Sequence, residues 1–288
     1  MTPSDVTRIT GFSQRWRERR EWRVPARGVI APERYQVDVL ERPPAKAFCE
    51  RHHYSGTFPA ARLSVGLFEH GTGDSGSHLV GVTVFGVSMN GQVVPRHLGV
   101  ESHRGVELSR LVLLDRVPGN AESWFMARAF RLLQREKPEI EAVVSYCDPV
   151  PRHSAAGDVV LPGHVGIVYQ ALNAVYRGRG SARTLLLAPS GRVVSERALS
   201  KIRNRERGHG YAESQLVALG APPRRFAEAP RDWIERVRAS DCLRSMRHPG
   251  NHVYAFGLTR EARRHIRIEA KGALPYPKKH MDPEVPRS

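Results

Sequence analysis

The order of apolar and polar positions along the chain predicts an α/β protein. Alternating residues with a Gly/Ser-rich turn at 71–77 indicate two antiparallel strands, and helical spacing of apolar residues marks a later amphipathic helix that Pro138 ends. The strands expected are 63–68, 79–87, 106–114, 142–147, 182–188 and 252–258. The helices expected are 45–53, 123–137, 167–176, 195–207, 211–219 and 231–238.

The succession of strand, loop and helix between residues 106 and 188 favours parallel pairing with right-handed crossovers. The predicted fold class is therefore a mixed central sheet flanked by helices. The strand at 252–258 is expected to rejoin this sheet, which makes the segment before it an insert rather than a second domain.

The domain organisation follows from shifts in composition. Residues 1–40 are expected to form a basic, Arg-rich arm, which either follows a phosphate backbone or is a solvated tail. Residues 41–288 are expected to form one catalytic domain, with a basic helical insert at 196–248 and an extended tail at 272–288. The tail carries a Pro-Tyr-Pro sequence, which cannot continue a helix.

Charge points to a polyanionic partner. The formal net charge is +16, and arginine carries nearly all of the positive charge. A GC-rich genome would explain arginine in place of lysine, but not the surplus over Asp and Glu. Double-stranded DNA is the expected partner, since guanidinium groups bind phosphate bidentately. The residues expected to contact DNA are Arg197, Lys201, Arg203, Arg205 and Arg207.

Other signals bound the class of protein. Cys49, Cys147 and Cys242 are widely spaced, so no disulfide framework is expected. The basic start of the chain has no apolar h-region, and no apolar run reaches the about 20 residues that span a bilayer. We therefore expect an intracellular protein that does not engage membranes. The histidine pairs lack a third ligand, so no metal site is expected.

The loop at 116–121 leaves a predicted strand and enters a predicted helix. Free N–H groups and the positive end of the helix dipole meet at such a junction, which makes it a candidate anion site. Arg116 adds charge, Gly119 permits close backbone approach, and Asn120 is placed to cap the helix. The same loop could be a simple turn, and Glu122 beside it adds a negative charge.

Several short motifs resemble a known family. The Arg-x-x-Gly-x-Ala sequence after the strand is similar to the pyrophosphate loop of GNAT acyltransferases. More narrowly, the order of five motifs between residues 50 and 260 resembles the phage Mom family of DNA-modification proteins. The motifs are His53-Tyr54-Ser55-Gly56, Glu107-Leu108-Ser109-Arg110, the run 115–123, Ser145-Tyr146-Cys147-Asp148 and the run 166–171.

This resemblance implies a GNAT-like fold whose two central strands splay, and a transferase that modifies the exocyclic N6 amine of adenine in phage DNA. Such an enzyme would block restriction in the cytoplasm of the bacterial host, where other phage modification enzymes would be its further partners. The implied cofactor is acetyl-CoA or a related acyl donor. The residues that would hold it are Val112, Leu114, Arg116, Gly119, Asn120 and Ala121.

The candidate catalytic residues each have a structural alternative. Arg110 either forms a structural salt bridge with Glu107 or Asp148, or faces the gap between the splayed central strands and binds a phosphate or a base there. Asp148 ends a strand at its carboxyl edge, where it either meets ligand or caps the loop. The pair His53-Tyr54 would supply a base or a stacking platform, or would be ordinary surface.

Two further candidates begin predicted helices. Ser123 would lie in the active cleft of the family or simply start a helix. Tyr169 matches the tyrosine acid of many GNAT enzymes, or is a buried core tyrosine. We expect Arg110, Ser123, Asp148 and Tyr169 to meet at one edge of the sheet. Two other functions stay open: a GNAT enzyme acting on a hypermodified pyrimidine, and a non-catalytic DNA-binding protein on a GNAT core.

Overall fold

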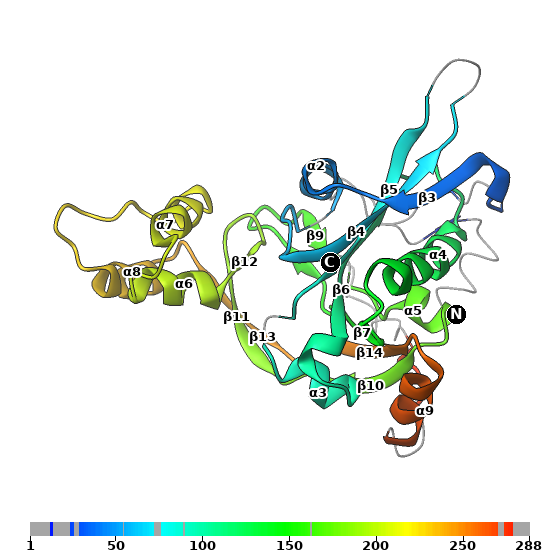
Figure 1. The fold of residues 1–288 in the computed structure, drawn as a ribbon. Coiled ribbons are helices and arrows are strands. Elements are labelled where there is room, and N and C mark those ends of the chain that lie inside the picture. The colour runs from blue at the N-terminus through cyan, green and yellow to red at the C-terminus, as the bar shows by residue number, and fades with distance from the viewer. Residues whose placement is uncertain are drawn as a thin grey trace, which may run out of the picture. The chain divides into compact units, whose positions relative to one another are not determined.

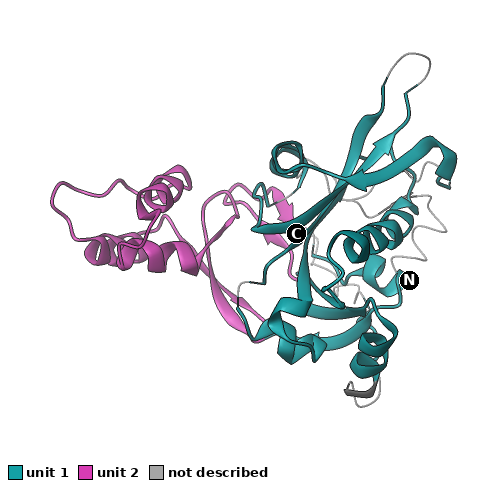
Figure 2. Cartoon of the chain, in the orientation of Figure 1, with its two compact units in different colours: residues 1–149, 163–180, 251–288 teal, residues 150–162, 181–250 magenta. Residues whose placement is uncertain are grey.

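The computed structural model describes residues 12–13, 24–25, 29–53, 55–71, 76–88, 90–161, 163–269 and 274–278. They fall into two units, each with its own packing (Figure 2). Unit 1 comprises residues 1–149, 163–180 and 251–288, and unit 2 comprises residues 150–162 and 181–250. No helix among the described residues is long and apolar enough to cross a membrane.

A seven-stranded sheet forms the centre of unit 1 (Figure 1). Its strands, in spatial order, are β10 (Val175–Arg179), β14 (His252–Gly257), β7 (Ala142–Cys147), β6 (Gly105–Leu113), β5 (His78–Gly86), β4 (Ala61–Glu69) and β3 (Tyr35–Val39). Within these described strands, β6 and β7 are the one parallel pair. The fold is thus mixed α/β, as the sequence predicts, with a mostly antiparallel sheet.

Helices cover both faces of this sheet, which explains why β4 and β5 are apolar along most of their length rather than alternating. On one face lie α4 (Ala121–Glu136) and α5 (Ile167–Ala171). On the other face lie α2 (Arg42–His52), α3 (Val93–Leu98) and α9 (Arg260–Glu269). Short 3-10 turns, η1 (Pro32–Arg34) and η2 (Ser102–Arg104), precede β3 and β6.

The helix α4 shows how the sequence builds this packing. Its buried residues include Phe125, Ala129 and Leu133, which recur every four positions and therefore line one side of the helix. That side packs into the larger core of unit 1. The helix ends at Glu136, two residues before Pro138, as its pattern predicts.

Unit 2 has a core of its own, built around the fully buried Trp233 together with Leu199, Ile202, Leu216 and Val237. Its helices are α6 (Glu196–Arg203), α7 (His209–Ala218) and α8 (Pro230–Ala239). Its strands are β8 (Arg152–His153), β9 (Val159–Leu161), β11 (Arg183–Leu187), β12 (Val193–Val194) and β13 (Arg244–His248). The expected insert at 196–248 lies inside this unit.

Some expectations about secondary structure were wrong. The strand expected at 182–188 exists as β11, but it pairs with β12 and β13 in a separate three-stranded sheet rather than with the central sheet. The helix expected at 167–176 ends at Ala171, because Asn173 adopts a left-handed conformation with φ 58° and the chain then becomes β10. The strand expected at 252–258 does rejoin the central sheet: it forms β14, which pairs with β7.

The ends of the chain also differ from expectation. Residues 35–39, assigned to the basic arm, form the edge strand β3. The short strands β1 (Phe12–Ser13) and β2 (Val24–Pro25) pair with each other, and the rest of 1–28 lies outside the described residues. Of the tail, residues 274–278 are described and have no regular secondary structure, in keeping with an extended course.

Candidate functional site

The parallel pairing of β6 and β7 ends part-way along both strands. The ladder runs from Gly105 and Ala142 to Leu108 and Ser145. Beyond it, β6 continues to Leu113 on its β5 side, and β7 continues to Cys147 on its β14 side. The carboxyl ends of the two central strands are therefore not hydrogen-bonded to each other. Such ends are where open α/β sheets bind ligands.

Arg110 is the residue of β6 that follows this opening. Its Nε donates to the carbonyl oxygen of Thr57 at 3.1 Å, and its Nη2 donates to Oγ1 of Thr57 at 2.8 Å. Nη1 donates to the carbonyl oxygen of Ser109 at 2.6 Å. Arg110 forms no ion pair with any described carboxylate, neither Glu107 nor Asp148. Its guanidinium is thus held in place by neutral acceptors, with no described carboxylate within ion-pair distance.

His53 lies at the end of α2, where its backbone N–H still bonds to Cys49. Its Nδ1 accepts the backbone N–H of Ser55 at 3.1 Å and lies 2.8 Å from Oγ of the same residue. Burial, together with the smaller effects of the Arg110 and His164 charges, lowers the pKa of His53 to about 3. The ring is therefore neutral at physiological pH, with its proton on Nε2 because Nδ1 is an acceptor.

Glu107 lies on β6 beside the last rungs of the parallel ladder, where its partner is Val144. Burial raises the pKa of this carboxyl, while the charge of Arg110 and a hydrogen bond from Ser109 lower it in part. The Ser109 hydroxyl donates to Oε1 of Glu107 at 3.5 Å. A half-buried carboxylate with a raised pKa beside an arginine is the kind of group that acts as a general base.

Tyr146 and Asp148 stand on the β7 side of the opening. Burial raises the pKa of Tyr146 to about 12, and the negative charge of Glu107 raises it as well, so the phenol stays protonated. Asp148 follows β7, and its backbone oxygen accepts the N–H of His164 at 2.8 Å. Because the charge of His164 lowers the pKa of His53, His164 lies within electrostatic reach of the end of α2.

Arg110 and Tyr169 lie on opposite faces of the sheet. Arg110 is paired with Val84, and Val84 packs in the cluster that contains Phe48 of α2. Tyr169 packs in the opposite cluster with α4, and its ring lies 5.4 Å from that of Tyr254. The expectation that Arg110, Ser123, Asp148 and Tyr169 form a single cleft is therefore wrong, because two of them are separated by the sheet itself.

Ser123 and Tyr169 occupy structural settings. The Ser123 hydroxyl donates to the backbone oxygen of Asn120 at 3.2 Å, in the first turn of α4. Tyr169 is 7% exposed and also packs edge-on against Phe256. Tyr54, proposed with His53, lies outside the described residues.

The expected anion loop is occupied by contacts within the chain. Arg116 pairs through Nε with Glu69 at 3.1 Å. Asn120 does not cap α4 with its side chain, a correction to the expectation, because its Oδ1 accepts the N–H of Ile30 at 2.9 Å. The N–H groups of Val117 and Ala121 bond to oxygens within the loop. These residues fit a structural turn better than a pyrophosphate site.

The remaining residues expected to hold an acyl donor lie around this turn. Val112, on β6, is 8% exposed and packs against α2, whereas Leu114 borders both the cluster under α4 and the cluster under α2. Ala121 is fully buried at the start of α4, and Gly119 precedes it in the loop. Their surroundings are mainly apolar, and the donor site stays a prediction.

The basic residues of the insert divide into two kinds. Arg197 is engaged in a bidentate pair with Glu206, at 2.8 and 2.5 Å. Arg203, Arg205 and Arg207 are exposed and form no ion pair with described residues, and Lys201 is half-buried. Those three arginines are therefore the better candidates for phosphate contact.

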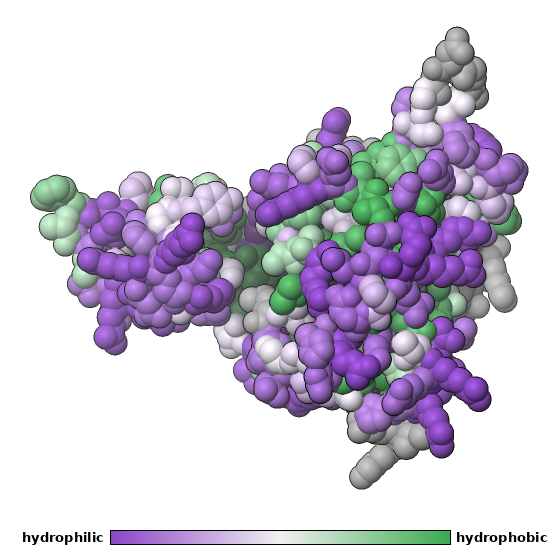
Figure 3. Space-filling view, in the orientation of Figure 1, coloured by the Kyte–Doolittle hydropathy of each residue, from purple (hydrophilic) through white to green (hydrophobic). Residues whose placement is uncertain are grey.

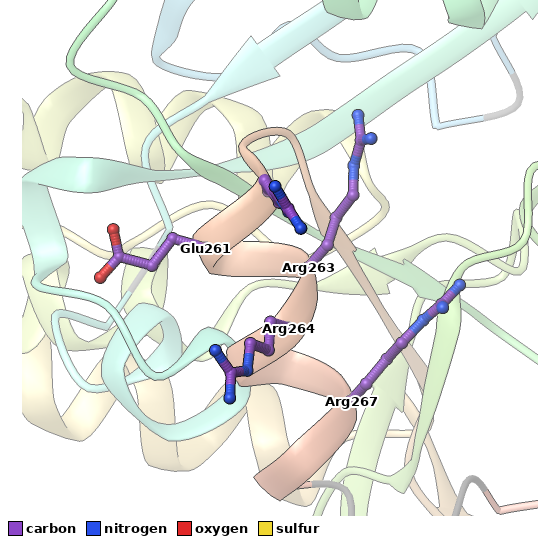
Figure 4. Close-up of a pocket in the computed structure, with 5 residues that line it drawn as sticks. Glu261, Arg263, Arg264 and Arg267 are labelled. Atoms are coloured by element: carbon purple, nitrogen blue, oxygen red, sulfur yellow. The ribbon is translucent and has the colours of Figure 1, made fainter.

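A second basic surface lies on α9, a helix that the sequence reading missed although its apolar positions Ala262 and Ile266 are four residues apart. An open hollow of about 860 Å³ is lined by Arg260, Glu261, Arg263, Arg264 and Arg267 (Figure 4). Arg263 is tied to the backbone oxygens of Gly257 and Leu258. Within the described part of the chain, no group of three His, Cys, Asp or Glu side chains is arranged to hold a metal ion.

Fold and site together define an α/β protein in which the central parallel strand pair opens onto a polar group of His53, Glu107 and Arg110. Residues 34–278 match the model of the Mom protein family. The chain belongs to that family.

A curated relative is the "Methylcarbamoylase mom" of Escherichia phage Mu, which is 31% identical over 131 residues. The match covers 45% of this chain and 47% of that protein, so the chain spans about half the length of the relative.

Proposed function

We propose that the protein is a transferase that modifies the exocyclic N6 amine of adenine in phage DNA and so protects that DNA from restriction in the infected cell. Membership of the Mom family and the methylcarbamoylase name of the phage Mu relative support this reaction class. The net charge of +16 supports DNA as the substrate.

The observation that carries the proposal is the group formed by His53, Glu107 and Arg110 where β6 and β7 separate. A purely structural cluster rarely combines a neutral imidazole, a carboxyl with a raised pKa and an arginine that forms no ion pair with a described carboxylate. The interrupted parallel ladder is also what a GNAT-like fold would require. We therefore place the reaction on the face of the sheet that α2 covers.

Each residue has a distinct role in this proposal. An adenine extruded from the duplex presents its amine to the site, since that amine cannot be reached inside the stack. The amine nitrogen attacks the carbonyl carbon of an activated donor, the bond to the donor's leaving group breaks, and Glu107 takes the amine proton. Arg110 stabilises the negative charge that develops on the carbonyl oxygen.

His53 acts as a hydrogen-bond donor rather than a base. Nδ1 accepts the backbone N–H of Ser55, so the proton of the neutral ring is on Nε2, which can only donate. If His53 took up a second proton, the imidazole would become a cation, and its pKa of about 3 shows that the folded protein disfavours that charged form. We therefore assign His53 to orienting the base or the donor, and leave proton removal to Glu107.

The reaction class is tested by mass spectrometry of nucleosides from DNA of cells that express the protein. A modified adenine supports the proposal. A modified pyrimidine that needs partner enzymes, or unmodified DNA with intact DNA binding, would support the hypermodified-pyrimidine enzyme or the non-catalytic DNA-binding protein instead.

A further inference from the structure

The loop that joins α7 and α8 in unit 2 exposes a large aromatic side chain at its tip. Phe226 is 103% exposed, the highest value among the large hydrophobic side chains of the described residues. Figure 3 shows the apolar tip at this loop. A phenylalanine ring left in water forgoes the free energy of burial, so a residue at this position is expected to meet an apolar surface elsewhere.

The tip of this loop is held rigidly. The carboxylate of Glu228 accepts Nε and Nη2 of Arg236 at 2.7 and 2.8 Å, and the backbone N–H of Arg225 at 2.8 Å. The hydrogen bond from Arg236 lowers the pKa of Glu228 to about 2, so this anchor stays charged at all ordinary pH values. Ala227 adopts φ 57°, which turns the chain directly after Phe226.

The base of the same loop is fixed as well. The indole Nε1 of Trp233, in the core of unit 2, donates to the backbone oxygen of Pro222 at 2.8 Å. Arg224 donates to the backbone oxygen of Glu228 at 2.8 Å and pairs with Glu213 at 3.3 Å. Phe226 is therefore presented by an ordered loop. Because the loop is already ordered, binding a partner costs little further conformational entropy.

A positively charged side chain lies next to this aromatic tip in the sequence. Arg225, next to Phe226, is exposed and forms no ion pair with described residues. The same unit carries the exposed Arg203, Arg205 and Arg207, and basic residues outnumber acidic ones between 196 and 248. An apolar tip next to an exposed arginine, in a unit with a surplus of positive charge, complements a polyanion that also offers flat apolar faces, and duplex DNA has both phosphates and stacked bases.

We propose that Phe226 is a wedge that inserts into the base stack of duplex DNA while Arg225 contacts the adjacent phosphates. This inference rests on the proposed function, because an enzyme that extrudes a base must offset the lost stacking. An aromatic face that replaces a stacking partner lowers that cost. Phe226 is then a positioning residue for the reaction rather than a catalytic one.

The test measures DNA structure rather than modification, so that it stands apart from the proposed function. The full chain is mixed with duplexes in which single adenines are replaced by 2-aminopurine, whose fluorescence rises when stacking is lost. We expect the wild type to raise this fluorescence at saturation and Phe226→Ala to abolish the rise. Tyr211→Ala, at a 71% exposed tyrosine of α7, is the matched control and should leave the rise intact.

Affinity and assembly complete the test. Phe226→Ala should weaken duplex binding several-fold without changing its salt dependence, since the ring neutralises no phosphate. An unchanged fluorescence rise in Phe226→Ala would overturn the wedge. So would a wild-type dimer that Phe226→Ala dissociates, because the ring would then belong to a protein interface. A fluorescence rise without any modified base would keep the wedge and reject the proposed function.

Discussion

Ser55 donates its backbone N–H to Nδ1 of His53 at 3.1 Å, and this bond makes Nδ1 an acceptor, so the neutral ring carries its proton on Nε2. A histidine that is held as a neutral donor cannot be the base of the reaction, even though its position in the sequence suggests that role. In the proposed mechanism the carboxyl of Glu107 takes that role.

The first prediction concerns acid stability. Burial, Arg110 and His164 lower the pKa of His53 from 6.5 to about 3. Between these values the unfolded chain binds a proton that the folded protein does not, so the free energy of unfolding falls as pH falls, by up to about 1.4 kcal/mol per pH unit. Above pH 6.5 the effect vanishes.

His53→Gln should therefore flatten the decline of stability between pH 6.5 and 4, as measured by urea unfolding at several pH values. Some slope will persist, because the pKa of His252 is also lowered, to about 4, mainly by burial. The exposed His153→Gln is the matched control and should leave the slope unchanged. A decline as steep in His53→Gln as in the wild type would contradict the assignment.

The second prediction concerns Glu107. Glu107→Gln preserves shape and the hydrogen bond from Ser109, but it cannot accept a proton. We expect the amount of modified adenine in cellular DNA to fall about a hundredfold or more, the range for loss of a general base, while the melting temperature holds. Glu101→Gln, at an exposed carboxyl, serves as the control. Normal modification by soluble Glu107→Gln would remove it from the mechanism.

The third prediction separates the two faces of the sheet. Arg110→Ala should abolish modification, because its unpaired charge lies at the opening between β6 and β7. Tyr169→Phe should keep modification within a few-fold of the wild type, because Tyr169 packs on the opposite face against Tyr254 and Phe256. The reverse ranking, measured at equal protein levels, would move the reaction to the α4 face.

The fourth prediction concerns DNA contact. Each phosphate that an arginine neutralises adds about 0.9 to the slope of log K against log salt. Arg203→Ala, Arg205→Ala and Arg207→Ala should each lower that slope, whereas Arg197→Ala should have a smaller effect because Arg197 is already paired with Glu206. Equal effects for Arg197 and Arg203 would show that the ion pair does not set which arginines meet DNA.

Much of the fold follows from local patterns in the sequence. The run 106–114 became β6, and the helical spacing of Phe125, Ala129 and Leu133 became α4. Strand periodicity does not specify the partner strand, and for that reason β11 was assigned to the wrong sheet. The end of α5 depends on one left-handed residue, Asn173, which the apolar pattern does not reveal.

The site was harder to predict, because it depends on which face of a strand each side chain occupies. Next to Ser109 the pairing of β5 and β6 shifts register, between Val84 and Phe85. Residues three apart in a regular strand lie on opposite faces of the sheet. The irregularity places Glu107 and Arg110 on the same face, which strict alternation does not predict. Motif order named His53 and Arg110 as candidates, and their roles stay predictions, but only the register could separate Arg110 from Tyr169.

The central claim is that a site on the α2 face modifies adenine in DNA. Its most direct test is nucleoside mass spectrometry of DNA from cells expressing the wild type, Glu107→Gln or Glu101→Gln at matched levels. The account predicts a new adenine adduct with the wild type and with Glu101→Gln, and its near-complete loss with Glu107→Gln. Unmodified adenine with the wild type, or an adduct that persists at full level in Glu107→Gln, would contradict it.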